Sequence, residues 1–234
     1  MNALIVGNGR VPPRHALPGA VFADVRFVVA ADGGAAGCEA LGLRPDLVVG
    51  DFDSADPGLV ARLARDGIPI RRVPAAKDES DLELALAAAL DRGAERVIAL
   101  GALGGPRIEH ALAAIALLQV AADRGVDMSI VDDRSTLRLL DCDGSERADR
   151  ALTIEGDPGD YVSLLPTAGD VRGVVTDGLR FPLRDEPLRS GPSRGLSNEL
   201  LGTTASVRAR SGRLLVVHTR RSAVEAAAHH PGEE

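Results

Sequence analysis

The stretch RFVVAADGGAAGCEALGLRPDLVVGDFDS, residues 26–54, has the pattern of a strand, a helix and a second strand in close succession. Two continuous apolar runs, RFVVAA (26–31) and DLVVG (46–50), are typical of strands that are buried on both faces. The segment between them, GGAAGCEALGL (33–43), is alanine-rich and includes Gly42, a residue type that often ends helices. A strand–helix–strand unit of this kind predicts a parallel sheet covered by helices.

The same alternation continues along the first half of the chain. Further strands are predicted at residues 3–7, 68–73, 96–101 and 128–131, and further helices at residues 56–67, 78–93 and 108–125. Asp56 and Pro57 suit the start of the first of these helices, and either Asp78 or Ser80 can cap the second. We therefore predict an N-terminal three-layer α/β domain with a parallel sheet, at residues 1–140.

The composition and the predicted secondary-structure pattern of the sequence change after residue 132. Residues 132–150 are polar and rich in turn-forming types, and strand-like segments then follow at residues 151–156, 160–167, 171–179, 203–212 and 213–220. Because no helical pattern separates these segments, they predict a smaller C-terminal antiparallel β domain, a sandwich or roll, at residues 141–220. Residues 221–234 are predicted to form a C-terminal tail.

The composition limits the possible partners. The net charge is -7 and the calculated isoelectric point is about 5.3, so the chain has no excess of basic residues to neutralise a nucleic-acid backbone. No apolar run is long enough for a membrane span, and the N-terminal run is too short for a signal peptide. Cys38 and Cys142 have no zinc-ligand or CxxC spacing. We expect a cytoplasmic protein that binds neither nucleic acid nor membrane.

Asp51 and Asp53 directly follow the second apolar run, in VVGDFDSADP at residues 48–57. In an extended chain, residues two apart point to the same side. Like charges held close together repel each other unless a cation lies between them. This stretch alone fits either a cation site or a polar turn, because aspartate and serine are also common turn residues.

Further polar motifs fall at the predicted carboxyl ends of other strands, where open α/β sheets bind their ligands. These motifs are Asp32-Gly33-Gly34, Lys77-Asp78 with Asp81, and Gly104-Gly105-Pro106-Arg107. Paired glycines let the backbone approach a ligand closely, and a helix start offers free N–H groups to a phosphate. GNG at residues 7–9 lies at the same edge, where it can contact a nucleotide or form a plain turn.

Together these motifs supply several carboxylates, one lysine and one arginine around a single crevice. Mg²⁺ prefers oxygen ligands and would convert a group of carboxylates into a holder for polyphosphate. Lys77 and Arg107 can neutralise phosphate oxygens. The sequence therefore indicates phosphoryl-transfer chemistry with Mg²⁺ and a polyphosphate. It contains neither a Walker A motif nor GxGxxG, so the common nucleotide-binding folds are not indicated.

Four stretches, in order, resemble the thiamine pyrophosphokinase family over residues 30–200. They are ADGGAAGCEALGLRPDLVVGDFDS, KDESDLELAL, GALGGPRIEHALAAIALL and GLRFPLRDEPLRSGPSRGLSNEL. The resemblance implies an ATP-dependent enzyme that moves a diphosphate group from ATP to the hydroxyethyl oxygen of thiamine and releases AMP. It also implies an α/β domain followed by a β domain, and a homodimer that binds thiamine near the subunit interface.

The resemblance also assigns roles to individual residues. Asp51, Asp53 and Asp81 are expected to hold Mg²⁺, and Asp53, Asp81, Lys77 and Arg107 to take part in catalysis. The residues expected to bind the nucleotide are Asp32, Gly33, Gly34, Ser54, Asp78, Ser80, Gly104 and Gly105. Those expected to bind thiamine are Ser197, Asn198 and His110, although His110 also fits a partly buried helix position without such a role. One carboxylate is expected to accept the hydroxyl proton, and both Asp53 and Asp81 are candidates.

The sequence departs from the family pattern at several positions. Pro106 is inserted after the double glycine, Glu109 stands where an aspartate is usual, and Ser80 replaces a threonine. The chain has no tryptophan to stack on thiamine, so Phe181 and Tyr161 are candidates for that contact, unless both belong to the core.

Three other functions fit part of the sequence. A haloacid-dehalogenase-type phosphatase would use Asp51 as a nucleophile, with Asp132 and Asp133 as its downstream acidic pair. A diphosphotransferase acting on a pterin-type alcohol shares the phosphate chemistry. A non-catalytic nucleotide-binding module would leave the acidic residues, Lys77 and Arg107 without a role.

Overall fold

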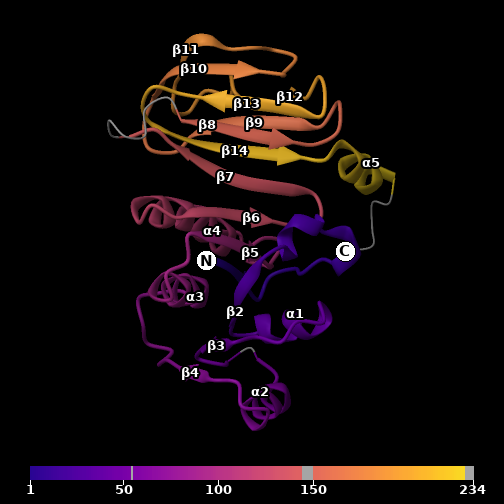
Figure 1. The fold of residues 1–234 in the computed structure, drawn as a ribbon, viewed down its shortest axis with the longest axis vertical. Coiled ribbons are helices and arrows are strands. Elements are labelled where there is room, and N and C mark those ends of the chain that lie inside the picture. The colour runs from indigo at the N-terminus through magenta and orange to yellow at the C-terminus, as the bar shows by residue number, and fades with distance from the viewer. Residues whose placement is uncertain (54, 144–149, 230–234) are drawn as a thin grey trace. The chain divides into compact units, whose positions relative to one another are not determined.

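The computed structural model describes residues 1–53, 55–143 and 150–229, with the backbone alone at residues 227–229. Ser54 and the end of the predicted tail, residues 230–234, lie outside the described residues. The chain divides into two compact units, Met1–Asp133 and Arg134–Glu234 (Figure 1). Each unit is described separately below.

The first unit contains a parallel sheet in the order β6-β5-β1-β2-β3-β4. Its strands are β1 Asn2–Val6, β2 Val25–Ala31, β3 Leu47–Gly50, β4 Ile70–Arg72, β5 Arg96–Leu100 and β6 Asp127–Val131. The chain runs outward from β1 to β4 and then returns to β5 on the other side of β1. The carboxyl ends of β1 and β5 therefore flank the point at which the strand order reverses, which is the usual ligand position in open α/β sheets.

Helices cover both faces of this sheet. They are α1 Gly34–Ala40, α2 Pro57–Arg65, α3 Asp81–Asp91 and α4 Ile108–Asp123, with short 3₁₀ turns η1 Arg14–Ala16 and η2 Gly19–Phe22 between β1 and β2. Leu4 and Val6 of β1 share one core with Cys38 of α1 and Leu59 of α2. Helices α3 and α4 pack on the opposite face, as Figure 1 shows, and the three-layer arrangement is that predicted from the sequence.

The capping residues of α2 and α3 mark where the polar loops end and these helices begin. Asp56 caps α2 by accepting a hydrogen bond from the N–H of Gly58 at 2.9 Å. Ser80 caps α3, because its Oγ accepts from the N–H of Glu83 at 3.2 Å. The helix predicted from residue 78 thus begins at Asp81, and Asp78 lies in the loop before the cap.

The second unit is a β-sandwich followed by one helix. One layer has the order β12-β9-β14-β7 and the other β11-β10-β13-β8, with antiparallel pairing throughout. The elements are β7 Ser135–Asp141, β8 Ala151–Glu155, β9 Tyr161–Pro166, β10 Val171–Asp177, β11 Arg184–Leu188, β12 Asn198–Glu199, β13 Thr204–Arg208, β14 Arg213–Thr219 and α5 Arg221–His229. Leu152, Val174 and Val207 from one layer share a core with Val162 and Leu214 from the other.

Three strands of the sandwich were not predicted from the sequence. The segment predicted to be polar and turn-rich contains β7, which pairs with β14 along its whole length. The other two are β11 and the two-residue β12. Their sequences, STLRLLD, RDEPL and NE, carry charges or too few apolar residues to give an alternating pattern.

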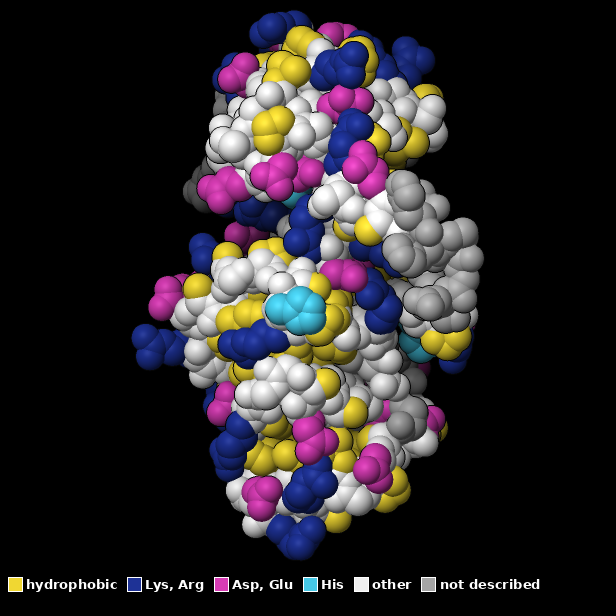
Figure 2. Space-filling view, turned by 90° about the vertical axis from the view of Figure 1, so that its right-hand side faces the viewer, with side chains coloured by type: hydrophobic (Ala, Val, Ile, Leu, Met, Phe, Trp, Pro, Cys, Tyr) yellow, Lys and Arg dark blue, Asp and Glu magenta, His cyan; other side chains and the backbone are white. Residues whose placement is uncertain are grey.

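The distribution of charged side chains on the surface bears on the expectation that the protein has no basic binding face. Lys and Arg side chains are interspersed with Asp and Glu over the face in Figure 2, so the described residues on that face form no continuous basic surface. Within the part of the chain that the structure describes, no helix is both long and apolar enough to span a bilayer.

Candidate active site

A cavity of about 490 Å³ lies in the first unit, where the chain leaves strands β1, β2, β3 and β5. Its wall contains most of the motifs picked out in the sequence. Among the residues that line it are Gly7, Asn8, Gly9, Asp32, Asp51, Asp53, Lys77, Ser80, Asp81, Gly101, Ala102, Gly105, Pro106, Arg107 and His110. The motifs therefore meet at the sheet edge where the strand order reverses, as their positions in the sequence predict.

Three carboxylates converge in this cavity. Asp32, Asp51 and Asp53 each offer an oxygen that lies within 4.8 Å of the other two. Asp32 is buried, with 3% of its surface exposed, whereas Asp53 is exposed. A compact set of carboxylate oxygens matches the ligand preference of Mg²⁺. Asp32 thus lies with Asp51 and Asp53, and Asp81, also expected from the sequence to hold the metal, forms an ion pair with Lys77 on the same cavity wall.

The turn that presents Asp51 and Asp53 is built around Phe52. Phe52 has a left-handed backbone, with φ of +64°, and its side chain packs against the core of the first unit. The guanidinium of Arg72 lies 4.7 Å from the centre of the Phe52 ring. Non-glycine residues in this conformation are strained and are concentrated at functional sites. Asp32 also has a positive φ, of +49°.

Lys77 places a positive charge beside Asp51 and Asp81. Its Nζ lies 2.6 Å from Oδ1 of Asp81 and 3.6 Å from Oδ2 of Asp51, and its side chain is 12% exposed. Burial lowers the pKa of Lys77, but the two carboxylates outweigh this effect and raise its pKa overall. Lys77 is therefore an ammonium ion held between two carboxylates at neutral pH.

The two aspartates beside Lys77 have different environments. The N–H of Asp53 donates to Asp51 at 3.2 Å, and this bond, together with Lys77, holds the pKa of Asp51 below its usual value. Burial raises the pKa of Asp81 above its usual value, and the nearby charge of Asp51 adds to this effect against the opposing effect of Lys77. The site therefore contains a carboxylate that ionises readily and another that holds its proton more strongly.

Glycines allow two loops to meet at the cavity. A β-carbon at Gly9 would lie 2.6 Å from the carbonyl oxygen of Gly101, and one at Gly7 would lie 2.7 Å from the same oxygen. Only glycine fits such close backbone approach. GNG at residues 7–9, for which the sequence left a plain turn open, is therefore part of the cavity wall, together with Asn8.

Arg107 and His110 enter the cavity wall from the start of α4. The Nε of Arg107 donates to Glu109 at 2.6 Å, and both side chains are mostly exposed. Pro106, the inserted residue, also lines the cavity. Arg107 thus lines the cavity despite the insertion of Pro106. Its guanidinium forms an ion pair with Glu109, the residue that replaces the usual aspartate.

Other predicted residues lie behind or beside the wall. Among the described residues, Gly33, Gly34, Asp78 and Gly104 are not part of the cavity lining. A β-carbon at Gly34 would overlap the carbonyl oxygen of Val6, so this glycine serves the packing of α1 against β1. Ser54 lies outside the described residues.

The predicted thiamine residues Ser197 and Asn198 belong to the second unit. A cavity of about 260 Å³ there is lined by Leu164, Phe181, Pro182, Leu183, Arg194, Gly195, Leu196 and Asn198. Ser197 is exposed, with φ of +56°, and its N–H donates to Oγ of Ser163 at 3.1 Å. Phe181 is 61% exposed beside this cavity, whereas Arg221 stacks 4.8 Å from the centre of the Tyr161 ring. Of the two candidate aromatic residues, Phe181 is therefore the one next to a cavity.

Two family models match successive parts of the chain. The model of the thiamin pyrophosphokinase catalytic domain matches residues 19–130, and that of the thiamin pyrophosphokinase vitamin B1 binding domain matches residues 151–214. The chain belongs to the thiamin pyrophosphokinase family. It is therefore a kinase-type transferase, and membership of this family supports thiamine pyrophosphorylation as its general activity.

Individual members of the thiamin pyrophosphokinase family match most of the chain. Thiamine pyrophosphokinase of Bacillus subtilis (strain 168) is 25% identical over 179 residues, which make up 76% of this chain and 80% of that protein. The crystal structure of thiamin pyrophosphokinase from Geobacillus thermodenitrificans has 29% identity and a TM-score of 0.76, covering 95% of this chain and 99% of that chain. The crystal structure of the Bacillus subtilis enzyme has 22% identity and a TM-score of 0.81, covering 94% and 100%. These matches confirm the predicted fold class.

The family assignment favours the main interpretation over its alternatives. Asp51 follows the third strand rather than the first, and Asp133 forms an ion pair with Arg10. Neither Asp132 nor Asp133 is among the described residues that line the cavity, so the acidic pair of the phosphatase reading is not at the site. The match to a vitamin B1 binding domain favours thiamine over a pterin-type alcohol.

Proposed function

We propose that the chain transfers the diphosphate group of ATP to the hydroxyl group of thiamine in a Mg²⁺-dependent reaction that releases AMP. The observation that carries this proposal is the convergence of Asp32, Asp51 and Asp53 beside Lys77, at the edge where the strand order of the sheet reverses. This arrangement provides ligands for a hard cation and a positive charge for phosphate oxygens, which are the main needs of phosphoryl transfer.

The residues of the first unit support our assignment of the nucleotide to that unit. Mg²⁺ held by the three carboxylates would neutralise phosphate oxygens and polarise the transferred group. Lys77 and Arg107 contribute fixed positive charge on the same wall, and Gly7 and Gly101, which have no side chains, leave room for the nucleotide there. We assign ATP to this α/β domain and thiamine to the β domain.

The transfer itself is one displacement. The hydroxyl oxygen of thiamine attacks the β-phosphorus of ATP, the bond between that phosphorus and the oxygen bridging to the α-phosphate breaks, and AMP leaves. The hydroxyl proton passes to a carboxylate; Asp53 and Asp81 both border the cavity and are the two candidates.

In the second unit, Phe181 offers an aromatic face to the thiamine rings. Both cysteines are buried and free, which supports a reducing, cytoplasmic location.

We expect AMP and thiamine diphosphate to form in equal amounts when the protein is incubated with Mg-ATP and thiamine. Chromatographic separation of the nucleotides and the thiamine esters measures both products. Removal of divalent cations with EDTA should stop the reaction, and an excess of Mg²⁺ should restore it. Formation of ADP, or hydrolysis of a phosphomonoester without ATP, would contradict the proposal.

We also propose that the enzyme is a homodimer with its active site near the subunit interface. Helix α4 presents large apolar side chains to solvent, with Ile108 71%, Leu112 60% and Val120 40% exposed. They recur at intervals of four or eight residues and so lie along one side of the helix. An exposed apolar stripe favours a protein partner. Because α4 also supplies His110 to the cavity wall, a second copy on this stripe would lie next to the cavity.

A light-scattering measurement after size-exclusion chromatography tests the dimer. We expect a mass twice the 24.3 kDa of the chain. Leu112→Glu should shift the mass to that of the monomer, because it puts a charge into an apolar contact. Val224→Glu, at a 40% exposed valine of α5, is the control and should leave the dimer intact. A fully active wild-type monomer is the result that refutes an interface-dependent site.

A further inference from the structure

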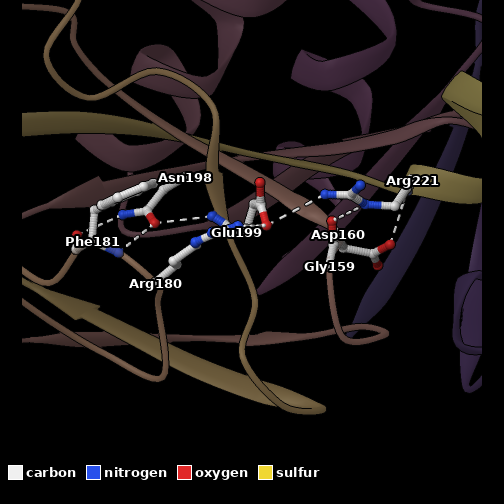
Figure 3. A network of polar contacts seen from close by, with 7 residues as sticks. All are labelled: Gly159, Asp160, Arg180, Phe181, Asn198, Glu199 and Arg221. Atoms are coloured by element: carbon white, nitrogen blue, oxygen red, sulfur yellow. Dashed lines mark hydrogen bonds and ion pairs between the residues drawn. The ribbon is translucent and has the colours of Figure 1, made fainter.

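The side-chain amide of Asn198 forms hydrogen bonds with both backbone polar groups of Phe181, its N–H and its carbonyl oxygen. Its Oδ1 accepts hydrogen bonds from the N–H of Phe181 and the N–H of Glu199, both at 2.9 Å, and its Nδ2 donates to the carbonyl oxygen of Phe181 at 2.7 Å (Figure 3). Asn198 is buried, with 9% of its surface exposed. These three bonds use both lone pairs of Oδ1 and one of the two Nδ2 hydrogens.

These three hydrogen bonds of Asn198, called the clamp below, determine how the ring of Phe181 is held. Pairing both backbone groups of one residue fixes the direction in which its side chain leaves the chain. The Phe181 side chain is 61% exposed and lies with Asn198 on the wall of the 260 Å³ cavity of the second unit. A large apolar ring held in a solvent-exposed position at a cavity is arranged for contact with a ligand rather than for core packing.

Further polar contacts hold the clamp in place. The carboxylate of Glu199 lies 3.0 Å from Nη1 of Arg180 and 3.4 Å from Nη2 of Arg221. Arg221, the first residue of α5, donates from Nε to the carbonyl oxygen of Gly159 at 2.7 Å and from its N–H to the buried carboxylate of Asp160 at 2.9 Å. Figure 3 shows these residues as one chain of contacts from α5 to Phe181.

We propose that Asn198 is a positioning residue, which acts on the thiamine site through the ring of Phe181 rather than by contacting thiamine itself. This inference rests on the proposed function of the second unit. It gives Asn198 a different role from the direct substrate contact that its sequence motif implies. The amide, already bonded to Phe181 and Glu199, has little remaining capacity for a substrate, whereas the Phe181 ring is exposed, with the guanidinium of Arg180 5.7 Å from its centre.

A double-mutant cycle separates the two roles. Asn198→Ala should weaken thiamine binding about tenfold, measured as the dissociation constant by calorimetry and as KM, with the KM for ATP unchanged. In the Phe181→Ala background, which keeps the backbone groups of residue 181, the same change should weaken thiamine binding by less than about twofold. Equal losses in both backgrounds would show direct contact between Asn198 and thiamine and would overturn the inference.

A second variant keeps the test decisive if Asn198→Ala does not fold. Glu199→Gln removes the charge that joins Arg180 to Arg221 and should weaken thiamine binding about threefold, again only when Phe181 is present. Glu155→Gln, at an exposed glutamate on β8 outside this network, is the matched control and should leave binding unchanged. An unchanged thiamine KM in Glu199→Gln, or equal losses with and without Phe181, would count against the inference.

The proposed function can fail separately. A wild-type protein that neither binds thiamine nor forms thiamine diphosphate would overturn the proposed function, and with it this inference. An active wild-type enzyme with additive losses in the cycle would overturn the positioning role alone.

Discussion

Asp51→Asn and Asp53→Asn are each expected to lower kcat by at least about 10³-fold while the protein stays folded. Each change removes one charged oxygen donor from the group formed with Asp32. A lost contact to a metal ion that stabilises the transition state is worth about 4 kcal/mol, which corresponds to that factor. Steady-state formation of AMP and thiamine diphosphate at saturating Mg²⁺ measures the loss.

The stability of these variants distinguishes a role in function from a role in folding. Like charges in the metal-free protein repel, so Asp53→Asn should leave the melting temperature unchanged or raise it. Calorimetric titration should also show weaker Mg²⁺ binding than in the wild type. Asp56→Asn is the matched control, three residues after Asp53, because Asp56 caps α2, is not among the described residues that line the cavity, and can be replaced as a cap by asparagine. Near-normal rates in both Asp51→Asn and Asp53→Asn would refute the metal-holding role.

The α/β half of the fold was predictable because most of its strands, all but β4, are largely buried. Such strands need continuous apolar runs, so segments such as ALIVG and RVIALG indicate β1 and β5 without any knowledge of their partners. The position of the site followed from the same fact. In a parallel sheet the loops after the strands meet at one edge, so motifs far apart in the sequence could be expected to converge.

The sandwich was harder to predict because its strands need only one apolar face. In β7, STLRLLD, the polar residues outnumber the apolar ones, and the strand is stabilised by pairing with β14, more than 70 residues later. The two-residue β12 exists because it pairs with β9 and because Asn198 binds Phe181. Long-range pairings of this kind leave no periodic signal in the local sequence.

Within the active site, the sequence identified residue types better than it identified partners. It singled out Lys77 and Asp81, but it could not show that they pair with each other, nor that the carboxylate of Asp32 lies close to those of Asp51 and Asp53. The contribution of GNG at residues 7–9 depends on the approach of the loop after β5. A signal was available, because glycines on either side of Asn8 suggest close backbone approach.

Lys77→Met is expected to lower kcat by about 10²- to 10³-fold, the usual loss when one fixed electrostatic group is removed from a transition state. The ammonium ion of Lys77 is the charge that lies between Asp51 and Asp81, at 3.6 Å and 2.6 Å. Without it, the carboxylates repel one another and would also repel the phosphates of ATP. Lys77→Arg is the conservative comparison, which keeps the charge but not its compact shape, and should retain more activity than Lys77→Met.

The pH dependence of stability gives a second measurement on the same variant. Lys77 lowers the pKa of both Asp51 and Asp81, so its removal raises both, and the pKa of Asp81, already raised by burial, moves further upward. A carboxyl group whose pKa is higher in the folded protein than in the unfolded protein lowers the free energy of unfolding. This loss grows as the pH rises from the unfolded-state pKa toward the folded-state pKa. Lys77→Met should therefore be most destabilised relative to wild type near pH 7. The difference should shrink as the pH falls to about 4 and below, first as Asp81 and then as Asp51, whose pKa is lowered, becomes protonated.

Chemical denaturation at several pH values, with and without Mg²⁺, tests whether Lys77 acts by this electrostatic route. A divalent cation bound among the same carboxylates would replace part of the lost charge, so Mg²⁺ should stabilise Lys77→Met more than it stabilises the wild type. A loss of stability that is the same at pH 4 and pH 7 and does not respond to Mg²⁺ would mean that the lysine contributes through packing of its aliphatic stem. In that case the ion pairs with Asp51 and Asp81 would not be what organises the site.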